Sequence, residues 1–246
     1  MPAVPGWGAG SGERSGAPPF AVTHIVFDVD GTLVDFEVAL RNALEAAASR
    51  CSELTAASPA ALQQVRDLVI VEAEWSRALL ADARRESLRR VLAAGGVTGE
   101  AAVEDVTETF FRARAETTPV YDVHPTLDAL LERGFTLVAA SNGNLDLSVP
   151  GLDRYFAAAL FAADAEHLKP DPRFFEQAVA LAGGTPALTL AVGDRLDDDY
   201  EPARLAGMAP VLIDREGAVD DTAARRIGAL TELVPMVELP PPRRGS

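Results

Sequence analysis

The sequence predicts an α/β protein built on a doubly wound parallel sheet, with a helical domain inserted into it. Short apolar runs such as 24–28, 135–140 and 188–192 have the length of buried strands, and helical segments separate them. Near-continuous apolar strands are typical of parallel sheets that helices cover on both faces. From about residue 37 to 117 the chain contains no Pro except Pro59, and its Ala, Leu, Glu and Arg content favours helix.

Local sequence signals place the remaining core elements. Gly134 ends a helix that starts near Pro125, and Asp171 followed by Pro172 is a typical helix start. A weaker apolar run and a final one complete the sheet. In chain order we expect strands and helices of the core at 24–28, 125–133, 135–140, 158–161, 172–182, 188–192, 202–206 and 210–213.

These elements suggest a division of the chain into four parts. The Gly-, Pro- and Ser-rich residues 1–20 are expected to be a disordered leader, and the end of the chain a flexible tail. The core and its insertion lie between them. We expect the α/β core to comprise 21–36 and 118–235, the helical cap 37–117, and the tail 236–246.

Composition excludes several classes of function. The 246 residues are 48% apolar, enough for a sizeable core, and carry a formal net charge of -15. Such an acidic chain is not expected to bind nucleic acid or an anionic membrane. The single Cys51 excludes an intramolecular disulfide and a Cys-rich zinc site. No signal peptide or membrane span is recognisable, so we expect a cytoplasmic protein.

Polar residues follow three of the expected strands where each strand ends. Asp28 and Asp30 follow the first, Ser141-Asn142 the second, and an Asp-rich segment that starts at Asp194 the third. Ligands of parallel sheets bind at this edge, so these groups should converge. Clustered carboxylates without His or Cys suit a hard cation such as Mg²⁺, although Asp-rich turns also occur as solvated loops or helix caps.

Four of these segments together resemble the motifs of the haloacid dehalogenase superfamily. Asp28-Val-Asp-Gly-Thr is similar to its first motif and Ser141-Asn142 to its second. Lys169, the chain's single lysine, resembles the third, and Gly193-Asp194-Arg-Leu-Asp-Asp-Asp199 has the form of the fourth. The resemblance covers about residues 22–215 and implies a Rossmann-like core with a helical cap after the first motif.

The resemblance implies a role for each residue of the motifs. Asp28 would be the nucleophile that forms an aspartyl-phosphate, Asp30 the general acid and base, and Lys169 a positive charge beside Asp28. Residues expected to bind phosphate are Gly31, Thr32, Ser141 and Asn142. Mg²⁺ would be held by the Asp28 side chain, the Asp30 backbone carbonyl and Asp194, with support from Asp199.

The implied function is a Mg²⁺-dependent phosphatase, a phosphoric monoester hydrolase that acts on a small phosphorylated metabolite. A phosphomutase or a non-catalytic binding protein on the same fold are the alternatives. Asp30 argues against dehalogenation, because the dehalogenases of this superfamily lack that second Asp. A Schiff-base hydrolase is excluded, because residues 36–117 contain no lysine. Substrate identity and oligomeric state stay open.

Substrate choice is expected to lie in the helical insertion, which would act as a lid. The candidates for substrate contact are Trp75, Arg77, Arg84 and Arg85. Arginines on an Ala- and Glu-rich helix usually form a solvated face, and a lone Trp is more often packed in a core. Both interpretations stay open at this point.

Overall fold

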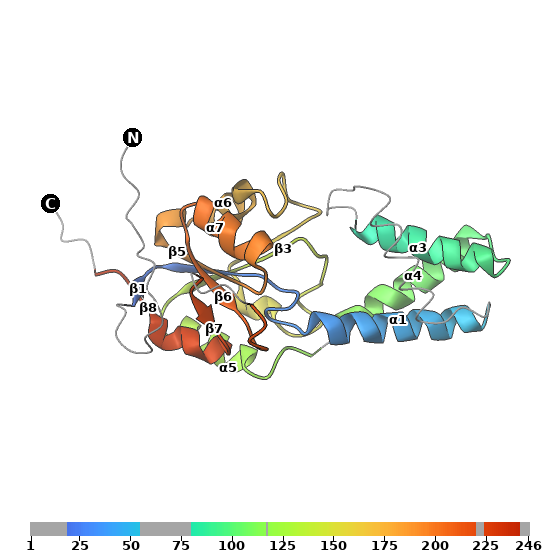
Figure 1. Cartoon of the computed structure of the whole chain (residues 1–246), viewed down its shortest axis with the longest axis horizontal. Coiled ribbons are helices and arrows are strands. Elements are labelled where there is room, and N and C mark those ends of the chain that lie inside the picture. Colours follow the sequence, from blue (N-terminus) through green and yellow to red (C-terminus); the bar gives the residue numbers. More distant parts are fainter. Residues whose placement is uncertain (1–18, 55–79, 117, 220–223, 242–246) are drawn as a thin grey trace. The chain divides into compact units, whose positions relative to one another are not determined.

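The computed structural model describes residues 19–54, 80–116, 118–219 and 224–241 (Figure 1). The chain divides into two compact units, and each is described by itself. The first unit comprises 1–33, 120–141 and 154–246, and the second comprises 34–119 and 142–153. Most of the expected leader, the last five residues of the expected tail, and the substrate candidates Trp75 and Arg77 lie outside the described residues.

A six-stranded parallel sheet forms the centre of the first unit, which confirms the predicted fold class. Its strand order is β4-β3-β2-β5-β6-β7. The strands are β2 (His24–Phe27), β3 (Thr136–Ser141), β4 (Ala158–Phe161), β5 (Thr189–Gly193), β6 (Ala209–Ile213) and β7 (Arg226–Ile227). The apolar strands are buried on both faces, as parallel strands between helical layers must be.

The central position of β2 determines where the polar loops meet. Phe27, the last residue of β2, is opposite Ala139 of β3 and Val192 of β5. The three strands therefore end nearly level at one edge of the sheet. Each is followed by the polar residues singled out from the sequence, so the topology brings those segments to one place.

Helices cover both faces of this sheet. Figure 1 shows α6 (Pro172–Leu181) and α7 (Glu201–Leu205) on one face and α5 (Val123–Glu132) on the other. Asp171 caps α6 by accepting a hydrogen bond from the Arg173 backbone NH at 3.0 Å, as the sequence signal predicts. The core beneath α6 and α7 comprises Val26, Val138, Ala140, Leu160, Phe174, Phe175, Ala178, Val179, Ala191, Ala203, Ala206 and Met208.

Several short elements have no counterpart in the sequence analysis. The strand β8 (Val237–Glu238) pairs in parallel with β1 (Phe20–Ala21), so the expected flexible tail 236–246 contains an ordered strand and that expectation is wrong there. Two-residue strands show no periodic pattern, which is why sequence reasoning missed them. The other short elements are η2 (Asp153–Tyr155), η3 (Pro186–Leu188), η4 (Leu196–Tyr200) and η5 (Leu230–Met236).

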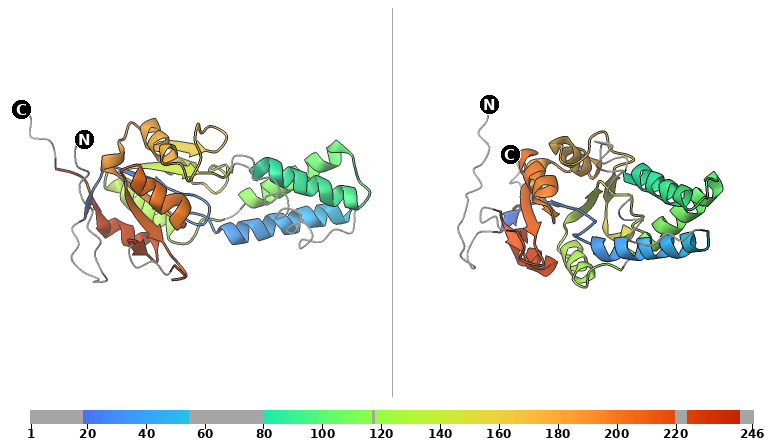
Figure 2. Two further views of the ribbon diagram at one scale, coloured as in Figure 1. Left: turned by 45° about the horizontal axis from the view of Figure 1, so that its top comes forward. Right: turned by 45° about the vertical axis from the view of Figure 1, so that its right-hand side comes forward.

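In the second unit, the described part of 34–119 is mainly helical, whereas 142–152 forms turns and loop. It contains α1 (Phe36–Ser52), α3 (Leu80–Ala94) and α4 (Glu100–Ala115), and α4 packs against both other helices (Figure 2). Alanines on α1 let the helices approach closely. The core between these three helices comprises Ala43, Ala47, Ala48, Cys51, Leu88, Val91, Leu92, Val103, Val106 and Phe110. The cap bounds 37–117 stay a prediction.

No helix in the described part of the chain has the length and apolar character needed to cross a lipid bilayer.

Candidate active site

Asp28 stands at the exit of the central strand, where the chain turns sharply. Its backbone NH continues the sheet by donating to the Val192 carbonyl at 2.8 Å. The turn that follows is closed by a 2.9 Å hydrogen bond from Leu33 NH to the Val29 carbonyl. Gly31 has a φ of 93°, and a Cβ there would lie 2.3 Å from Asp194 Oδ2. Only glycine therefore fits beneath this carboxylate.

Lys169 joins two of the carboxylates. Its Nζ donates to Asp28 Oδ1 at 2.6 Å and to Asp199 Oδ1 at 2.7 Å, and the residue is 4% exposed. The ammonium also lies 5.7 Å from the centre of the Phe174 ring and 5.5 Å from that of Phe175. The positive charge is thus confined between two anions and two aromatic side chains.

Asp194 and Asp199 come from the segment after β5. Asp194 follows the strand directly, and Asp199 lies in the π-helical turn η4, where its Oδ2 accepts from the Arg195 backbone NH at 3.1 Å. A Cβ on Gly193 would lie 2.3 Å from the Cβ and Cγ of Asp199. The absence of a side chain at Gly193 therefore lets Asp199 reach Lys169.

Burial and crowding shift the titration of these groups. Burial, followed by the nearby Asp199 charge, raises the pKa of Asp194 to about 6. Burial also raises the pKa of Asp28 well above its ordinary value, even though Lys169 acts in the opposite direction. Burial alone would lower the pKa of Lys169, but contact with Asp199 and Asp28 outweighs it, and the pKa lies above its usual value. The carboxylates thus carry more negative charge than Lys169 offsets.

The residues present fit a divalent cation. Asp28, Asp194 and Asp199 each offer a carboxylate oxygen, all within 4.8 Å of one another. Asp28 Oδ2 and Asp194 Oδ1 are buried and accept no hydrogen bond within the described part of the chain. Both oxygens of Asp199 already accept hydrogen bonds, which leaves it the weaker ligand. Three carboxylates beside one ammonium, all with oxygen donors, suit a hard cation such as Mg²⁺.

The other predicted site residues do not all lie at this cluster. Ser141 Oγ donates to Asp30 Oδ2 at 3.4 Å, so these two lie together beside the cluster. Thr32 is fully buried, and its Oγ1 has no hydrogen-bond partner among the residues described. Asn142 begins a segment of the second unit. The structure therefore does not place Asn142 relative to Asp28.

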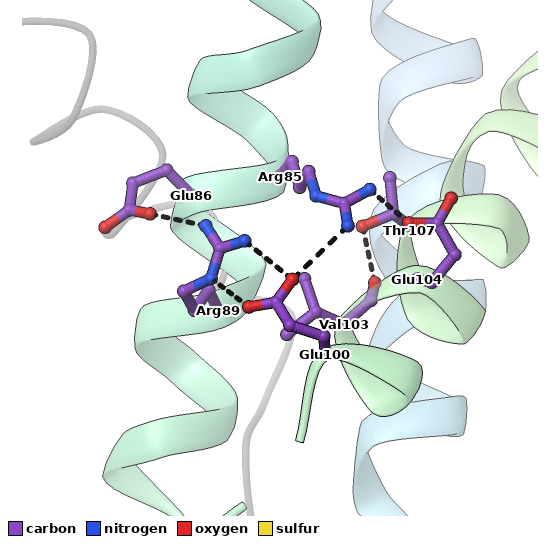
Figure 3. A network of polar contacts seen from close by, with 7 residues as sticks. All are labelled: Arg85, Glu86, Arg89, Glu100, Val103, Glu104 and Thr107. Atoms are coloured by element: carbon purple, nitrogen blue, oxygen red, sulfur yellow. Dashed lines mark hydrogen bonds and ion pairs between the residues drawn. The ribbon is translucent and has the colours of Figure 1, made fainter. Parts of the chain in front are cut away.

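The two described substrate candidates in the helical unit have structural partners. Arg84 is 6% exposed, and its guanidinium lies 5.6 Å from the centre of the Phe110 ring. Arg85 forms ion pairs with Glu100 and Glu104 of the neighbouring helix (Figure 3). These contacts favour the structural interpretation for both arginines.

Sequence reasoning missed a charged pair at the same edge of the sheet. Arg215, two residues after β6, donates to both carboxylate oxygens of Asp122 and to the Thr32 carbonyl. Neither residue belongs to a motif, and the neighbours of Arg215 in the sequence, Asp214 and Glu216, are more obvious partners for it than Asp122. No pattern in the sequence could have found this pair.

Comparison with known proteins gives a consistent family. Residues 22–207 match the family model described as haloacid dehalogenase-like hydrolase. A phosphoserine phosphatase of Thermus thermophilus is 34% identical over 61% of this chain and 63%, less than two thirds, of its own length. A phosphoglycolate phosphatase of Agrobacterium fabrum is 31% identical over 70% of this chain and 72% of its own. These names agree with the predicted phosphoric monoester hydrolase.

A solved structure extends the similarity to the fold. A 2-haloacid dehalogenase from Pseudomonas syringae pv. tomato has a TM-score of 0.75 and 29% identity, covering 87% of this chain and 97% of that one. The similarity thus reaches both phosphatases and a dehalogenase. What separates these reactions has to be sought in the residues of the site.

Proposed function

The chain belongs to the haloacid dehalogenase-like hydrolase family, and within it we propose a Mg²⁺-dependent phosphatase that acts on a small phosphorylated metabolite. One observation carries the proposal. Asp28 is buried, Lys169 holds its Oδ1, and its Oδ2 has no hydrogen-bond partner among the described residues. A carboxylate fixed at one oxygen and unoccupied at the other is suited to nucleophilic attack.

In the first step, Asp28 Oδ2 attacks the phosphorus of the substrate. A bond forms between that oxygen and phosphorus, and the bond from phosphorus to the leaving oxygen breaks, with its electron pair moving to the leaving oxygen. Asp30 gives its carboxyl proton to that oxygen, so an alcohol departs. Lys169, hydrogen-bonded to Asp28, offsets the negative charge that gathers at the site.

In the second step, Asp30 acts as a base. Its carboxylate takes a proton from a water molecule as the water oxygen bonds to phosphorus, and the bond to Asp28 breaks. Phosphate leaves, and Asp28 and Asp30 return to their starting states. Ser141, whose hydroxyl lies 3.4 Å from Asp30, is suited to donate to a phosphoryl oxygen. Asn142, Gly31 and Thr32 complete the proposed phosphate site.

The cation is assigned to the carboxylate cluster. Asp194 Oδ1, which has no hydrogen-bond partner among the described residues, would hold Mg²⁺ together with the Asp28 side chain and the Asp30 backbone carbonyl, with Asp199 in support. When bound, this ion neutralises the negative charge shared by the phosphoryl group and the carboxylates.

The names of the relatives support small phosphate esters as the substrate class. Phosphoserine and phosphoglycolate are both short carboxylates with one phosphate ester. The similarity to a dehalogenase raises that reaction as a second candidate. Asp30 favours phosphoryl transfer, because a departing halide needs no proton and a departing alkoxide does.

A direct assay tests the proposal. We expect the purified chain to hydrolyse p-nitrophenyl phosphate, phosphoserine or phosphoglycolate in Mg²⁺ and not in EDTA. Asp28→Asn should lower the rate by about 10³-fold or more, because a neutral amide is a poor nucleophile and a weaker partner for Lys169 and Mg²⁺. The matched control is Asp164→Asn, at an exposed aspartate of the same unit. Release of chloride from 2-chloropropionate without phosphatase activity would overturn the proposal.

A further inference from the structure

A buried ion pair lies directly beside the turn that carries Asp28 and Asp30. Arg215 Nη1 donates to Asp122 Oδ2 at 2.8 Å, and Nη2 donates to Oδ1 at 2.9 Å. The same Nη2 donates to the backbone carbonyl of Thr32 at 3.2 Å. The Asp122 side chain is 0% exposed and that of Arg215 22%. One guanidinium thus ties the turn to a fixed anion.

Asp122 is committed to this arrangement. It precedes α5 at the N-cap position, yet its side chain makes no capping hydrogen bond there. Its Oδ2 instead accepts a second hydrogen bond, at 2.8 Å, from the backbone NH of Leu230 at the start of η5. Three donors therefore hold its two oxygens. Two of them are the parallel N–H groups of the planar Arg215 guanidinium, a bidentate geometry that fits a carboxylate.

The contact with Thr32 completes the support of the turn. At the near end, the Asp28 backbone NH is anchored to β5 through the Val192 carbonyl. At the far end, Arg215 holds the Thr32 carbonyl and Val120 NH donates to the Leu33 carbonyl at 3.0 Å. The acid and base of the proposed reaction, Asp30, lies between these two anchors. It forms an isolated β-bridge and lies outside the named strands and helices.

We propose that Arg215, oriented by Asp122, is a positioning residue that keeps Asp30 aligned with the leaving oxygen. The inference rests on the proposed function, in which Asp30 donates the proton in the first step. Proton transfer depends steeply on the placement of the donor, so a small displacement of the turn weakens this step. Binding of the phosphate at Asp28 and Lys169 depends on other contacts and is affected less.

This role predicts a dependence on the leaving group. p-Nitrophenolate departs readily without a proton, whereas the alkoxide of phosphoserine or phosphoglycolate needs one. The parameter kcat/KM reports the steps up to and including the first phosphoryl transfer. Loss of the Arg215 contact should therefore lower kcat/KM for the alkyl ester more than for the aryl ester. A contact that only stabilises the fold would lower both equally.

Two variants separate positioning from stability. Arg215→Met alone leaves the Asp122 carboxylate buried without its cation, which destabilises the fold. The double variant Arg215→Met with Asp122→Asn leaves no unpaired charge and keeps an acceptor for Leu230 NH. Both variants lack the donor to Thr32. Arg204→Met is the matched control, because Arg204 of the same unit makes an exposed ion pair with Glu201.

We expect the double variant to melt close to the wild-type temperature. Its kcat/KM should fall about tenfold or more on the faster of the two alkyl esters and less than about threefold on p-nitrophenyl phosphate. The control should match the wild type on both. Equal losses on both esters, or full activity of the double variant, would overturn this inference. A wild type that hydrolyses no phosphate ester would overturn the proposed function itself.

Discussion

Charged side chains cluster in two regions of this protein, and the two clusters differ in burial and in their balance of charge. At the sheet edge, the side chains of Lys169, Asp28 and Asp199 are 3%, 9% and 4% exposed. Between α3 and α4, the side chains of Arg89 and Glu100 are 37% and 65% exposed. Figure 3 shows these two residues in a ladder of alternating charges between neighbouring helices.

The balance of charge differs as well. In the helical unit, Arg85 and Arg89 share the carboxylates of Glu86, Glu100 and Glu104, and hydrogen bonds between the partners outweigh burial in shifting the pKa values of Arg89 and Glu100. Such exposed pairs are screened by water and salt, and each contributes little to the stability of the fold.

At the sheet edge, by contrast, the carboxylates outnumber the one ammonium, and burial raises the pKa of Asp28 and Asp194. Burying like charges in this way destabilises the metal-free fold. The exposed region therefore contributes to helix packing, and the buried region holds an imbalance that a cation and a phosphoryl group can relieve.

We expect the largest loss of activity when the buried ammonium of Lys169 is replaced by a positively charged group of another shape. Lys169→Arg keeps the charge but replaces a compact ammonium with a planar guanidinium, for which the space between Asp28, Asp199 and the two Phe rings is unsuited. We expect a loss of about 10²- to 10³-fold in kcat for aryl phosphate hydrolysis. Arg173→Lys, at an exposed pair with Asp171, is the control and should leave kcat unchanged. A wild-type rate for Lys169→Arg would mean that the geometry of this cation is unimportant.

A smaller effect concerns pH and metal. The pKa of Asp194 is about 6 in the folded chain and 3.8 ordinarily, so the metal-free fold binds this proton more tightly than the unfolded chain. Stability from this group is fully present below about pH 4 and is lost as the pH rises through about 6. In EDTA, the Tm of the wild type relative to that of Asp194→Asn should therefore fall between these pH values. Scanning calorimetry across this range is the measurement.

Mg²⁺ should reverse that loss. At a hundredfold excess over its Kd, the ion should add about 2.7 kcal/mol, or about 5–10 °C in Tm, at pH 7. Asp194→Asn is the control for the titration, because it removes both the proton site and a proposed ligand. Its Tm should depend less on pH in this window and respond less to Mg²⁺. Equal responses of the variant and the wild type would refute this account.

The smallest effect is expected in the helical unit. Glu100→Gln removes the negative charge shared by Arg85 and Arg89, yet the midpoint of urea unfolding should stay close to that of the wild type. The difference should shrink in 1 M NaCl, because salt screens exposed charges. Glu45→Gln, at an exposed glutamate of α1 without an ion pair in the described part of the chain, is the control. A large loss of stability that persists in 1 M NaCl would contradict this difference between the exposed and the buried charges.

The sequence predicted most reliably the features that depend on short motifs of neighbouring residues. The family follows from short motifs at strand ends, and the family match over residues 22–207 confirms it. Asp28, Lys169, Asp194 and Asp199 do lie together, because parallel strands bring their carboxyl ends to one edge. Their roles remain predictions until the activity is measured.

Sequence reasoning failed where structure depends on distant partners. Arg215 and Asp122 are 93 positions apart, and no feature of the sequence near either residue indicates that they pair. The strand β8 has two residues, too few for a pattern, and exists because β1 lies beside it. Asn142 shares a motif with Ser141 but belongs to a different compact unit, a division that a dipeptide does not reveal.

The pairing of β1 with β8 has a consequence for protein engineering. Phe20 lies opposite Val237, so the first and last strands of the described chain leave the fold side by side. They do so near His24, at the opposite end of β2 from Asp28. A short linker could join them in a circular permutant, with new ends opened at an exposed turn. An affinity tag or a surface anchor fused next to β1 or β8 would be attached at the edge of the sheet that is remote from the carboxylates.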